Sequence, residues 1–451
     1  MKRFIAVCSL ALGAWTPGAT HGPVAMSDFE RELAALDVAI AAAGSPSSGE
    51  ATPAERTAAI AELIDRRASL TGNARDLERA SVALDNALAL AGPAEELLLL
   101  TADLKLRTHR VHEAARVLAS IPEPADPVRA ATLRADIDVQ DGDYVSAKHA
   151  YESLVESRPT WDRIARLAYL ESILGNPDRA DSLYASAADQ LTVKDMRQFA
   201  WLELQRGLLE FRRGRFEPAL AHYEHADRAY SGYWMTQDYL AELLAARAGT
   251  QTSSVRADSL EQVVLRAFGK RAGERASERA SERDSELRRA AELYERLLAT
   301  SAQPPAEQAL GDVYALLGDA ARSRAHHERA LSGYLESVQR GETQYLHHLA
   351  GYYADVAMNG AEAVRWARKD LEMRAGYAAH DALAWALFRN GEIESARQEM
   401  EPALASGVRD AHMLFHAAMI DLASGHRDKG QRLLREASAV NPLYPTFHVH
   451  R

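Results

Sequence analysis

The sequence predicts an all-α fold, a solenoid of stacked antiparallel helical hairpins with almost no β-structure. The first observation behind this prediction is a recurring pattern in which small residues alternate with an aromatic residue or Leu at helical spacing. Its clearest copies are Gly207, Gly214, Ala219, Tyr223 and Ala226; Leu310, Gly311, Tyr314, Gly318 and Ala330; and Ala384, Gly391, Ala396 and Ala403. Small residues allow two helices to cross closely, so the pattern indicates hairpins.

The second observation is the period of the pattern. Corresponding small residues recur about every 34 residues, the length of one two-helix unit. The pairs that show this spacing are Ala147 and Ala180, Ala363 and Ala396, and Ala396 and Gly430. A two-helix unit cannot bury its apolar face alone, because only neighbouring units can cover that face. The period therefore predicts a continuous stack of hairpins.

The N-terminal third, residues 26–128, is predicted to be a helical region of degenerate repeats. Its expected helices are Phe29–Ala43, Ala54–Leu70, Asp76–Leu90 and Ala94–Thr108. Thr52-Pro53-Ala54-Glu55 is typical of a capping box, with Pro at the first helical position. This motif fixes the start of the second helix.

Two repeat arrays are expected after this region, at residues 129–248 and at residues 290–451, the second ending in a C-terminal cap. Pro159 follows Ala147 at the same distance as Pro442 follows Gly430, and each Pro stands where a second helix should end, because Pro lacks the N–H that continues a helix. We expect small residues at the helix crossings and tyrosines in the wedges between hairpins: Ala168, Gly207, Gly311 and Ala384, and Tyr184, Tyr223 and Tyr314.

From about Ala131 to Pro442 the chain resembles the tetratricopeptide repeat (TPR) family. The C-terminal stretch matches best, through His380-Asp381-Ala382-Leu383-Ala384-Trp385-Ala386-Leu387-Phe388, Asn390-Gly391 and Ala439-Val440-Asn441-Pro442, and it looks like many bacterial proteins of this family. The resemblance implies a right-handed superhelix with a concave binding face.

The sequence departs from the family pattern in two ways. The intervals from Ala180 to Ala219 and from Gly318 to Gly360 are both longer than one period. Three polar residues stand where large apolar or aromatic residues are typical: Glu203, Arg206 and Glu210. These departures leave the local register open, although not the architecture.

Residues 249–289 lose the period and are predicted to be a charged connector. Residues 274–286 read ERASERASERDSE, and their closely spaced Arg–Glu pairs support a helix, although no apolar face accompanies them. The connector is either a solvated helix or disordered. A nucleic-acid strip is disfavoured, because the basic residues from 266 to 289 are interleaved with acidic ones.

The first 25 residues match a secretory signal peptide. Lys2-Arg3 precede an apolar run from Phe4 to Trp15, which is too short to span a membrane. Cleavage after Ala19 or Ala25 predicts a periplasmic or secreted protein without a stable membrane span. If translation instead begins at Met26, the protein is cytoplasmic.

The cysteine content excludes disulfide bonds, and the net charge disfavours nucleic-acid binding. The single cysteine, Cys8, lies in this leader, so the processed chain forms no disulfide. The formal net charge is −11, and it becomes −13 when Lys2 and Arg3 are removed. A general nucleic-acid binder should carry a basic excess, so the expected partner is a protein or peptide and not a nucleic acid.

The sequence motifs predict neither an enzyme nor a bound cofactor. The chain has no Gly-rich phosphate loop, no Gly-x-Ser-x-Gly motif and no cysteine metal motif. His412 and His416 lie one helical turn apart on a predicted helix, but Met413 replaces the adjacent Glu of a metalloprotease motif. We therefore assign no metal site, and keep histidine-based metal handling as an alternative. Asp381 is interpreted as a helix-start acid.

In the family's register, several large residues of the last two hairpins fall on the concave side and would form a protein-binding groove. They are Trp385, Phe388, His412, Phe415, His416 and Met419. Aromatic anchors supply much of the binding energy for peptides. A register shift of one residue would move them into the core.

These observations predict a non-enzymatic scaffold or adaptor that binds a protein segment on its concave face, in a bacterial cell envelope. Chaperone-tail binding is disfavoured, because the paired Asn, Lys and Arg residues of the carboxylate clamp are not matched. The remaining alternatives are the metal-handling accessory protein and a purely architectural spacer.

Overall fold

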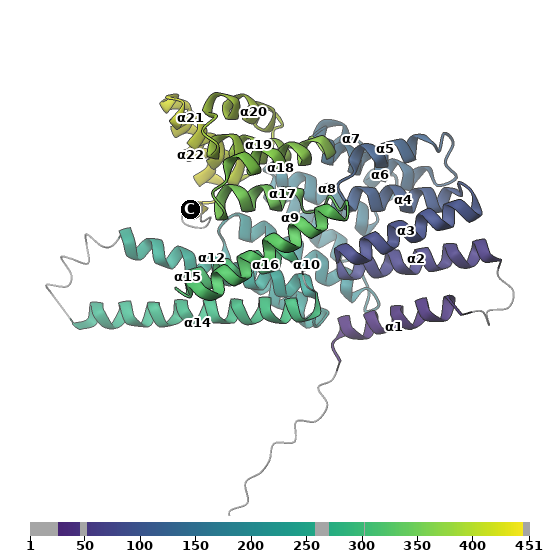
Figure 1. Ribbon diagram of the computed structural model, residues 1–451, viewed down its shortest axis with the longest axis horizontal. Coiled ribbons are helices and arrows are strands. Elements are labelled where there is room, and N and C mark those ends of the chain that lie inside the picture. Colours follow the sequence, from purple (N-terminus) through teal and green to yellow (C-terminus); the bar gives the residue numbers. More distant parts are fainter. Residues whose placement is uncertain (1–25, 46–51, 258–269, 302, 445–451) are drawn as a thin grey trace, which may run out of the picture.

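The computed structural model describes residues 26–45, 52–257, 270–301 and 303–444 (Figure 1). Within these ranges the chain forms 21 α-helices and one π-helix, without any strand, which confirms the all-α prediction. Consecutive helices pack as hairpins along the chain. The predicted leader, residues 1–25, lies outside the described residues. Among the described helices, none is both long and apolar enough to cross a membrane.

The hairpins divide the chain into three stretches. The N-terminal helices are α1 (Asp28–Ala43), α2 (Pro53–Thr71), α3 (Ala74–Ala91), α4 (Glu95–Arg107) and α5 (Val111–Ala119). The central helices are α6 (Pro127–Asp141), α7 (Tyr144–Ser157), α8 (Trp161–Ile173), α9 (Pro177–Ala188), α10 (Met196–Arg212), α11 (Phe216–Ala229), α12 (Trp234–Ala257) and α14 (Lys270–Thr300). The C-terminal helices are α15 (Pro304–Leu316), α16 (Ala320–Gln339), α17 (Leu346–Gly351), η1 (Tyr352–Val356), α18 (Gly360–Met373), α19 (Tyr377–Arg389), α20 (Ile393–Ala405), α21 (Ala411–Ala423) and α22 (Arg427–Val440).

Local chemistry sets the helix starts. The capping box predicted at the start of α2 is confirmed: the Thr52 hydroxyl accepts from the Glu55 N–H at 3.2 Å, and the Glu55 carboxylate accepts from the Thr52 N–H at 2.8 Å. Ser27 and Glu30 form a second box at the start of α1. Each box satisfies N–H groups that have no partner within the helix.

Small residues lie at the helix crossings, as predicted. A Cβ atom added at Gly207 would overlap the Tyr223 ring, and one at Gly311 would overlap the His327 ring. Ala168 and Ala384 are fully buried, and the wedge tyrosines Tyr184, Tyr223 and Tyr314 are buried as well. Hairpin arms therefore approach so closely that an added methyl group would displace a ring.

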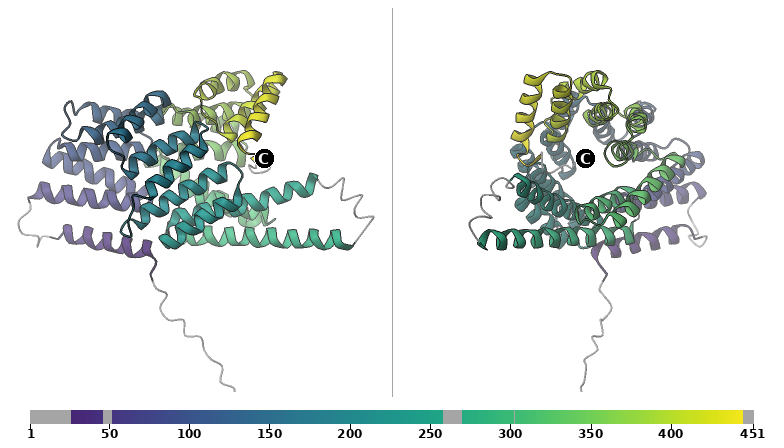
Figure 2. Two further views of the ribbon diagram at one scale, coloured as in Figure 1. Left: turned by 180° about the vertical axis from the view of Figure 1, so that it is seen from behind. Right: turned by 60° about the vertical axis from the view of Figure 1, so that its left-hand side comes forward.

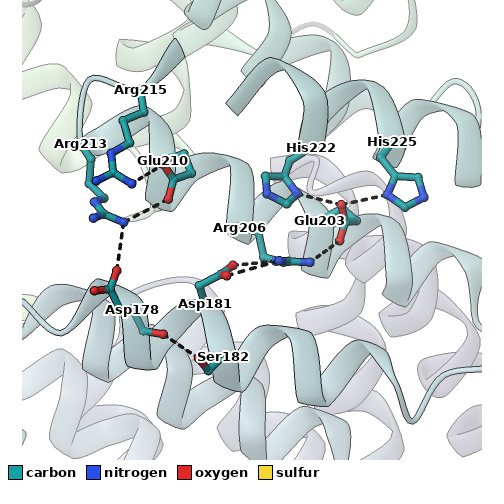
Figure 3. A network of polar contacts seen from close by, with 10 residues as sticks. All are labelled: Asp178, Asp181, Ser182, Glu203, Arg206, Glu210, Arg213, Arg215, His222 and His225. Atoms are coloured by element: carbon teal, nitrogen blue, oxygen red, sulfur yellow. Dashed lines mark hydrogen bonds and ion pairs between the residues drawn. The ribbon is translucent and has the colours of Figure 1, made fainter. Parts of the chain in front are cut away.

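The three polar departures from the family pattern form a network between α9, α10 and α11 (Figure 3). Glu203 is buried, and one of its carboxylate oxygens contacts Nδ1 of His222 at 2.9 Å and Nδ1 of His225 at 3.0 Å. Arg206 bridges from Glu203 to Asp181 on α9. Polar pairing thus replaces apolar packing while the hairpin arrangement is kept.

The other acid of this network, Glu210, receives two arginines from the α10–α11 loop. Nη1 of Arg213 lies 3.1 Å from one of its oxygens, and Nη1 of Arg215 lies 3.4 Å from the other. Arg213 also reaches Asp178 on α9, at 3.5 Å. The loop is therefore tied both to its own hairpin and to the preceding one (Figure 3).

The two long intervals in the repeat pattern have structural causes. Helix α10 has 17 residues, whereas the first helices α8, α15, α19 and α21 have 13, and this accounts for much of the extra length between Ala180 and Ala219. The interval from Gly318 to Gly360 contains α16, which has 20 residues, followed by α17. Helix α17 continues into the π-helix η1, whose wider turn takes up additional residues.

The predicted connector belongs to a long helical hairpin. Helices α12 and α14 pack against each other, and α14 contains the charged stretch 274–286. From Leu287 onward α14 buries an apolar stripe that includes Leu293, Tyr294 and Leu297. The hairpin extends beyond the body of the molecule in Figure 1, and residues 258–269 lie outside the described residues.

Successive turns of the superhelix contact each other. The Arg409 N–H donates to the Ile173 carbonyl at 2.8 Å. The Tyr377 N–H donates to the Tyr144 hydroxyl across 233 residues of sequence, and the Thr343 hydroxyl donates to the Thr108 carbonyl across 235 residues. These separations equal about seven repeats. The helices of one superhelical turn therefore form a ring around the interior, as the right-hand view of Figure 2 shows.

Candidate functional site: an interior cavity

A cavity of about 700 Å³ lies inside the superhelix. Helices α8, α9, α10 and α12 form one part of its wall, and α17, α19, α21 and α22 form another. Among its lining residues are Tyr169, Tyr184, Arg212, Tyr239, Glu242, Tyr377, Asp381, Asp410, His412 and Tyr444. The contacts between successive turns bring these distant segments together.

Tyrosines from both parts of the wall face this cavity. Tyr169 is 38% exposed, while Tyr239 and Tyr377 are half-buried. The Tyr144 hydroxyl accepts from the Tyr377 N–H at 3.1 Å, and the two rings meet edge to face at 6.4 Å, which holds Tyr377 in place. Each tyrosine offers an apolar ring together with a hydroxyl that donates and accepts, so the wall suits a ligand of mixed polarity.

Charged groups of both signs share the cavity. The side chains of Arg212 and Glu242 are exposed to cavity solvent, and Asp238 is half-buried on the same helix as Glu242. Enclosure by protein, followed by the Asp238 charge, raises the pKa of Glu242 to about 7. Enclosure raises the pKa of Asp238 to about 6. The charge of this wall therefore changes near neutral pH.

The six residues predicted to form a groove lie on α19 and α21, and the rings of five of them form one aromatic layer together with Tyr444. Trp385 is 6% exposed and His416 is 2% exposed, and their rings stack with centroids 4.1 Å apart. Phe388 stacks on Trp385 at 5.1 Å, and Phe415 meets Tyr444 at 5.4 Å. Trp385 and His416 are thus part of the packed wall.

The remaining two predicted groove residues, His412 and Met419, differ in exposure to the cavity. Met419, like Phe388 and Phe415, is partly buried against the C-terminal core. His412 lines the cavity and lies 5.8 Å from the Tyr444 ring. Of the six predicted groove residues only His412 lines the cavity, and most lining residues were not predicted, among them Tyr169, Arg212, Tyr239, Glu242 and Tyr377.

Asp381 does not act as a helix-start acid, which corrects the sequence interpretation. Helix α19 begins at Tyr377, so Asp381 lies in its second turn, where it is 6% exposed. Its carboxylate contacts Nδ1 of His416 at 2.9 Å. One ring nitrogen from each of His412 and His416 and one Asp381 oxygen lie within 4.8 Å of one another, as the ligands of one metal ion do.

Other histidines contact single acids and connect the helices of a hairpin. His326 contacts Glu307 on α15 and His380 contacts Glu399 on α20, both at 2.6 Å. His222 and His225 share Glu203. Within the described residues, Asp381, His412 and His416 are the one group whose three ligand atoms converge.

The stacked hairpins, the small residues at their crossings and the concave interior surface define a TPR-like helical repeat fold. No family model and no curated protein sequence matches the chain. Similar solved structures include a human IFIT1 dimer with PPP-AAAA, at 11% identity over 92% of this chain and 95% of that one, with a TM-score of 0.43. A monomeric IFIT1 mutant with Gppp-AAAA has 11% identity, coverages of 91% and 86%, and a TM-score of 0.46. A tetratricopeptide repeat protein from Parabacteroides merdae has 14% identity, coverages of 64% and 97%, and a TM-score of 0.33.

Proposed function

We propose that this protein is a non-enzymatic binding scaffold that holds an extended segment of a partner protein inside the interior cavity. The observation that carries the proposal is the cavity wall, where tyrosines from distant repeats surround Arg212 and Glu242. Such a surface can contact apolar side chains and also pair with the N–H and C=O groups of an extended chain.

The size of the cavity supports a short segment. Its volume of about 700 Å³ falls within the usual range of ligand sites, roughly 300 to 1,000 Å³. A wall held by contacts between superhelical turns is preorganised, so little free energy is lost in ordering it when a segment binds. The proposal places the binding surface inside the ring, and not on the aromatic layer around Trp385.

The proposed location is a bacterial cell envelope, supported by the leader-like first 25 residues. N-terminal sequencing of protein purified from the native host tests this part. A mature chain that begins at Thr20, after Ala19, supports export, whereas retention of Met1 contradicts it. Cleavage after Ala25 and translation from Met26 give the same first residue, so a chain that begins at Met26 supports export only if it is recovered from the periplasmic or secreted fraction, and recovery from the cytoplasm contradicts export.

A matched pair of variants tests the binding function. Tyr169→Ala with Arg212→Glu alters the cavity, whereas Val193→Ala with Arg228→Glu combines a truncation to Ala with the same charge reversal at strongly exposed positions outside the set of cavity-lining residues. We expect quantitative affinity mass spectrometry to show a partner lost only from the folded cavity variant. A partner list unchanged by the cavity variant, or the absence of any enriched protein, contradicts the proposal.

A further inference from the structure

We infer that Asp381, His412 and His416 bind one divalent transition-metal ion at the wall of the cavity. The inference is independent of the proposed protein partner, because it depends on ligand geometry alone. Two imidazoles and one carboxylate from two adjacent helices supply the three protein ligands.

The distances between the three groups suit a metal ion. Zinc–ligand bonds of about 2.0 to 2.2 Å in a tetrahedral site separate neighbouring ligand atoms by roughly 3.3 to 3.5 Å. The His416 nitrogen and Asp381 oxygen are already 2.9 Å apart, and all three ligand atoms lie within 4.8 Å. Small side-chain rotations are therefore enough to bring them onto one ion.

Helix geometry brings the two histidines together. His412 and His416 lie one turn apart on α21, and their ring centroids are 4.0 Å apart. Asp381 comes from α19, which packs directly against α21. The histidines and the acid thus lie on helices of different hairpins, whereas Glu203 and its two histidines belong to a single hairpin.

The chemistry of the ligands selects the class of metal. Imidazole nitrogens suit Zn²⁺, Co²⁺, Ni²⁺ and Fe²⁺, whereas Mg²⁺ and Ca²⁺ prefer oxygen ligands throughout. Three protein ligands leave at least one coordination position open. Asp381 and His412 both line the cavity, so the proposed ion lies at its wall.

Neighbouring aromatic rings restrict the ligand orientations. The Trp385 ring lies nearly parallel to the His416 ring, with an interplanar angle of 8°. The Trp385 indole N–H donates to Asp355 at 3.1 Å, which fixes the indole in turn. A site whose ligands are held by packing loses little side-chain freedom when the ion binds.

Titration calorimetry with Zn²⁺ on the full-length, untagged chain tests the inference, after metal has been removed by chelation and dialysis. We expect one ion per chain, no binding of Mg²⁺, and a visible absorption band on loading with Co²⁺. His412→Ala should weaken Zn²⁺ binding at least about tenfold, since even outer-shell changes cost that much. Asp381→Asn should do the same while its amide can still contact His416, which helps to keep the variant folded.

Two controls separate this site from other histidines. His225→Ala removes a half-exposed histidine beside a buried acid, Glu203, and should leave Zn²⁺ affinity unchanged. His448→Ala with His450→Ala removes the tail histidines, and it should also leave one Zn²⁺ bound. If the wild-type chain binds no Zn²⁺, if folded His412→Ala and Asp381→Asn bind it as well as the wild type, or if only the tail variant loses it, the inference is wrong.

Discussion

At the residue scale, acids within two hairpins contact basic side chains at fixed sequence separations. Glu203 on α10 contacts histidines 19 and 22 residues later, His222 and His225. Glu307 on α15 contacts His326 and Arg329 at the same two separations. The same arrangement therefore occurs in two hairpins. Sequence reasoning treated Glu203 as a departure from the family pattern, although its partners stood at fixed positions on the next helix.

The Glu203 carboxylate makes the stability of this region pH-dependent. Burial raises the pKa of Glu203, but the hydrogen bond from His222, its charge and that of Arg206 bring the pKa below the ordinary value. The ionised form is thus favoured by folding. Its stabilising contribution is present above the pKa of the unfolded chain, about 4.3, and is lost as the pH falls through the lower folded value.

We expect Glu203→Gln to lower the free energy of unfolding by about 1 to 3 kcal/mol at pH 7, because a charged acceptor of three donors is removed. The difference from the wild type should shrink as the pH approaches 3. Urea unfolding followed by circular dichroism at several pH values measures it, and Glu224→Gln on exposed α11 surface serves as the control. An equal loss at pH 7 and pH 3 would contradict this account.

At the element scale, the sequence predicts the N-terminal helices well. The four expected N-terminal helices match α1 to α4 to within two residues at each end, because capping residues and apolar spacing are local signals. The length of the α12–α14 hairpin and the π-helix η1 were not predicted. Both depend on packing with neighbouring hairpins, which a local pattern does not encode.

Two glycines test the crossing geometry. Gly207→Ala places a methyl group against the Tyr223 ring and should cost about 1 to 3 kcal/mol through overpacking. Gly351→Ala is the matched control, because its helical backbone is ordinary and nothing lies within 4 Å of the added atom. It should be neutral or stabilising by up to about 1 kcal/mol. Thermal unfolding measures the stability of both variants. Similar stabilities for the two would show that helices α10 and α11 do not cross at Gly207.

At the scale of the whole molecule, contacts between successive superhelical turns form the interior cavity. Contacts such as Arg409 with Ile173 depend on the rotation accumulated over about seven repeats, so they could not be read from any single repeat. The same limit explains why the sequence did not predict the residues that line the cavity. The sequence indicated a concave binding face and drew attention to His412 and His416, but the residues that face one another across the cavity follow from closure.

Two carboxyl groups of α12, Asp238 and the cavity-lining Glu242, give the stability of this region a distinct pH dependence. Asp238 and Glu242 have raised pKa values, about 6 and about 7, so folding favours their protonated forms. Their stabilising contribution is complete below about pH 4 and is lost as the pH rises through 6 to 7. We expect Asp238→Asn with Glu242→Gln to raise the thermal midpoint relative to wild type at pH 8, and to change it less at pH 5. The opposite pH trend would show that these carboxyls are stabilised in the ionised form.

The central claim, that a protein partner binds inside the ring, is tested most directly by site-specific photo-crosslinking in the native host. A benzophenone amino acid replaces Tyr169, which faces the cavity, or Val193, which is 86% exposed and does not line the cavity. We predict a covalent adduct with one partner from position 169 and not from position 193. Adducts with the same protein from position 193 alone, or no adduct from position 169, would contradict the account.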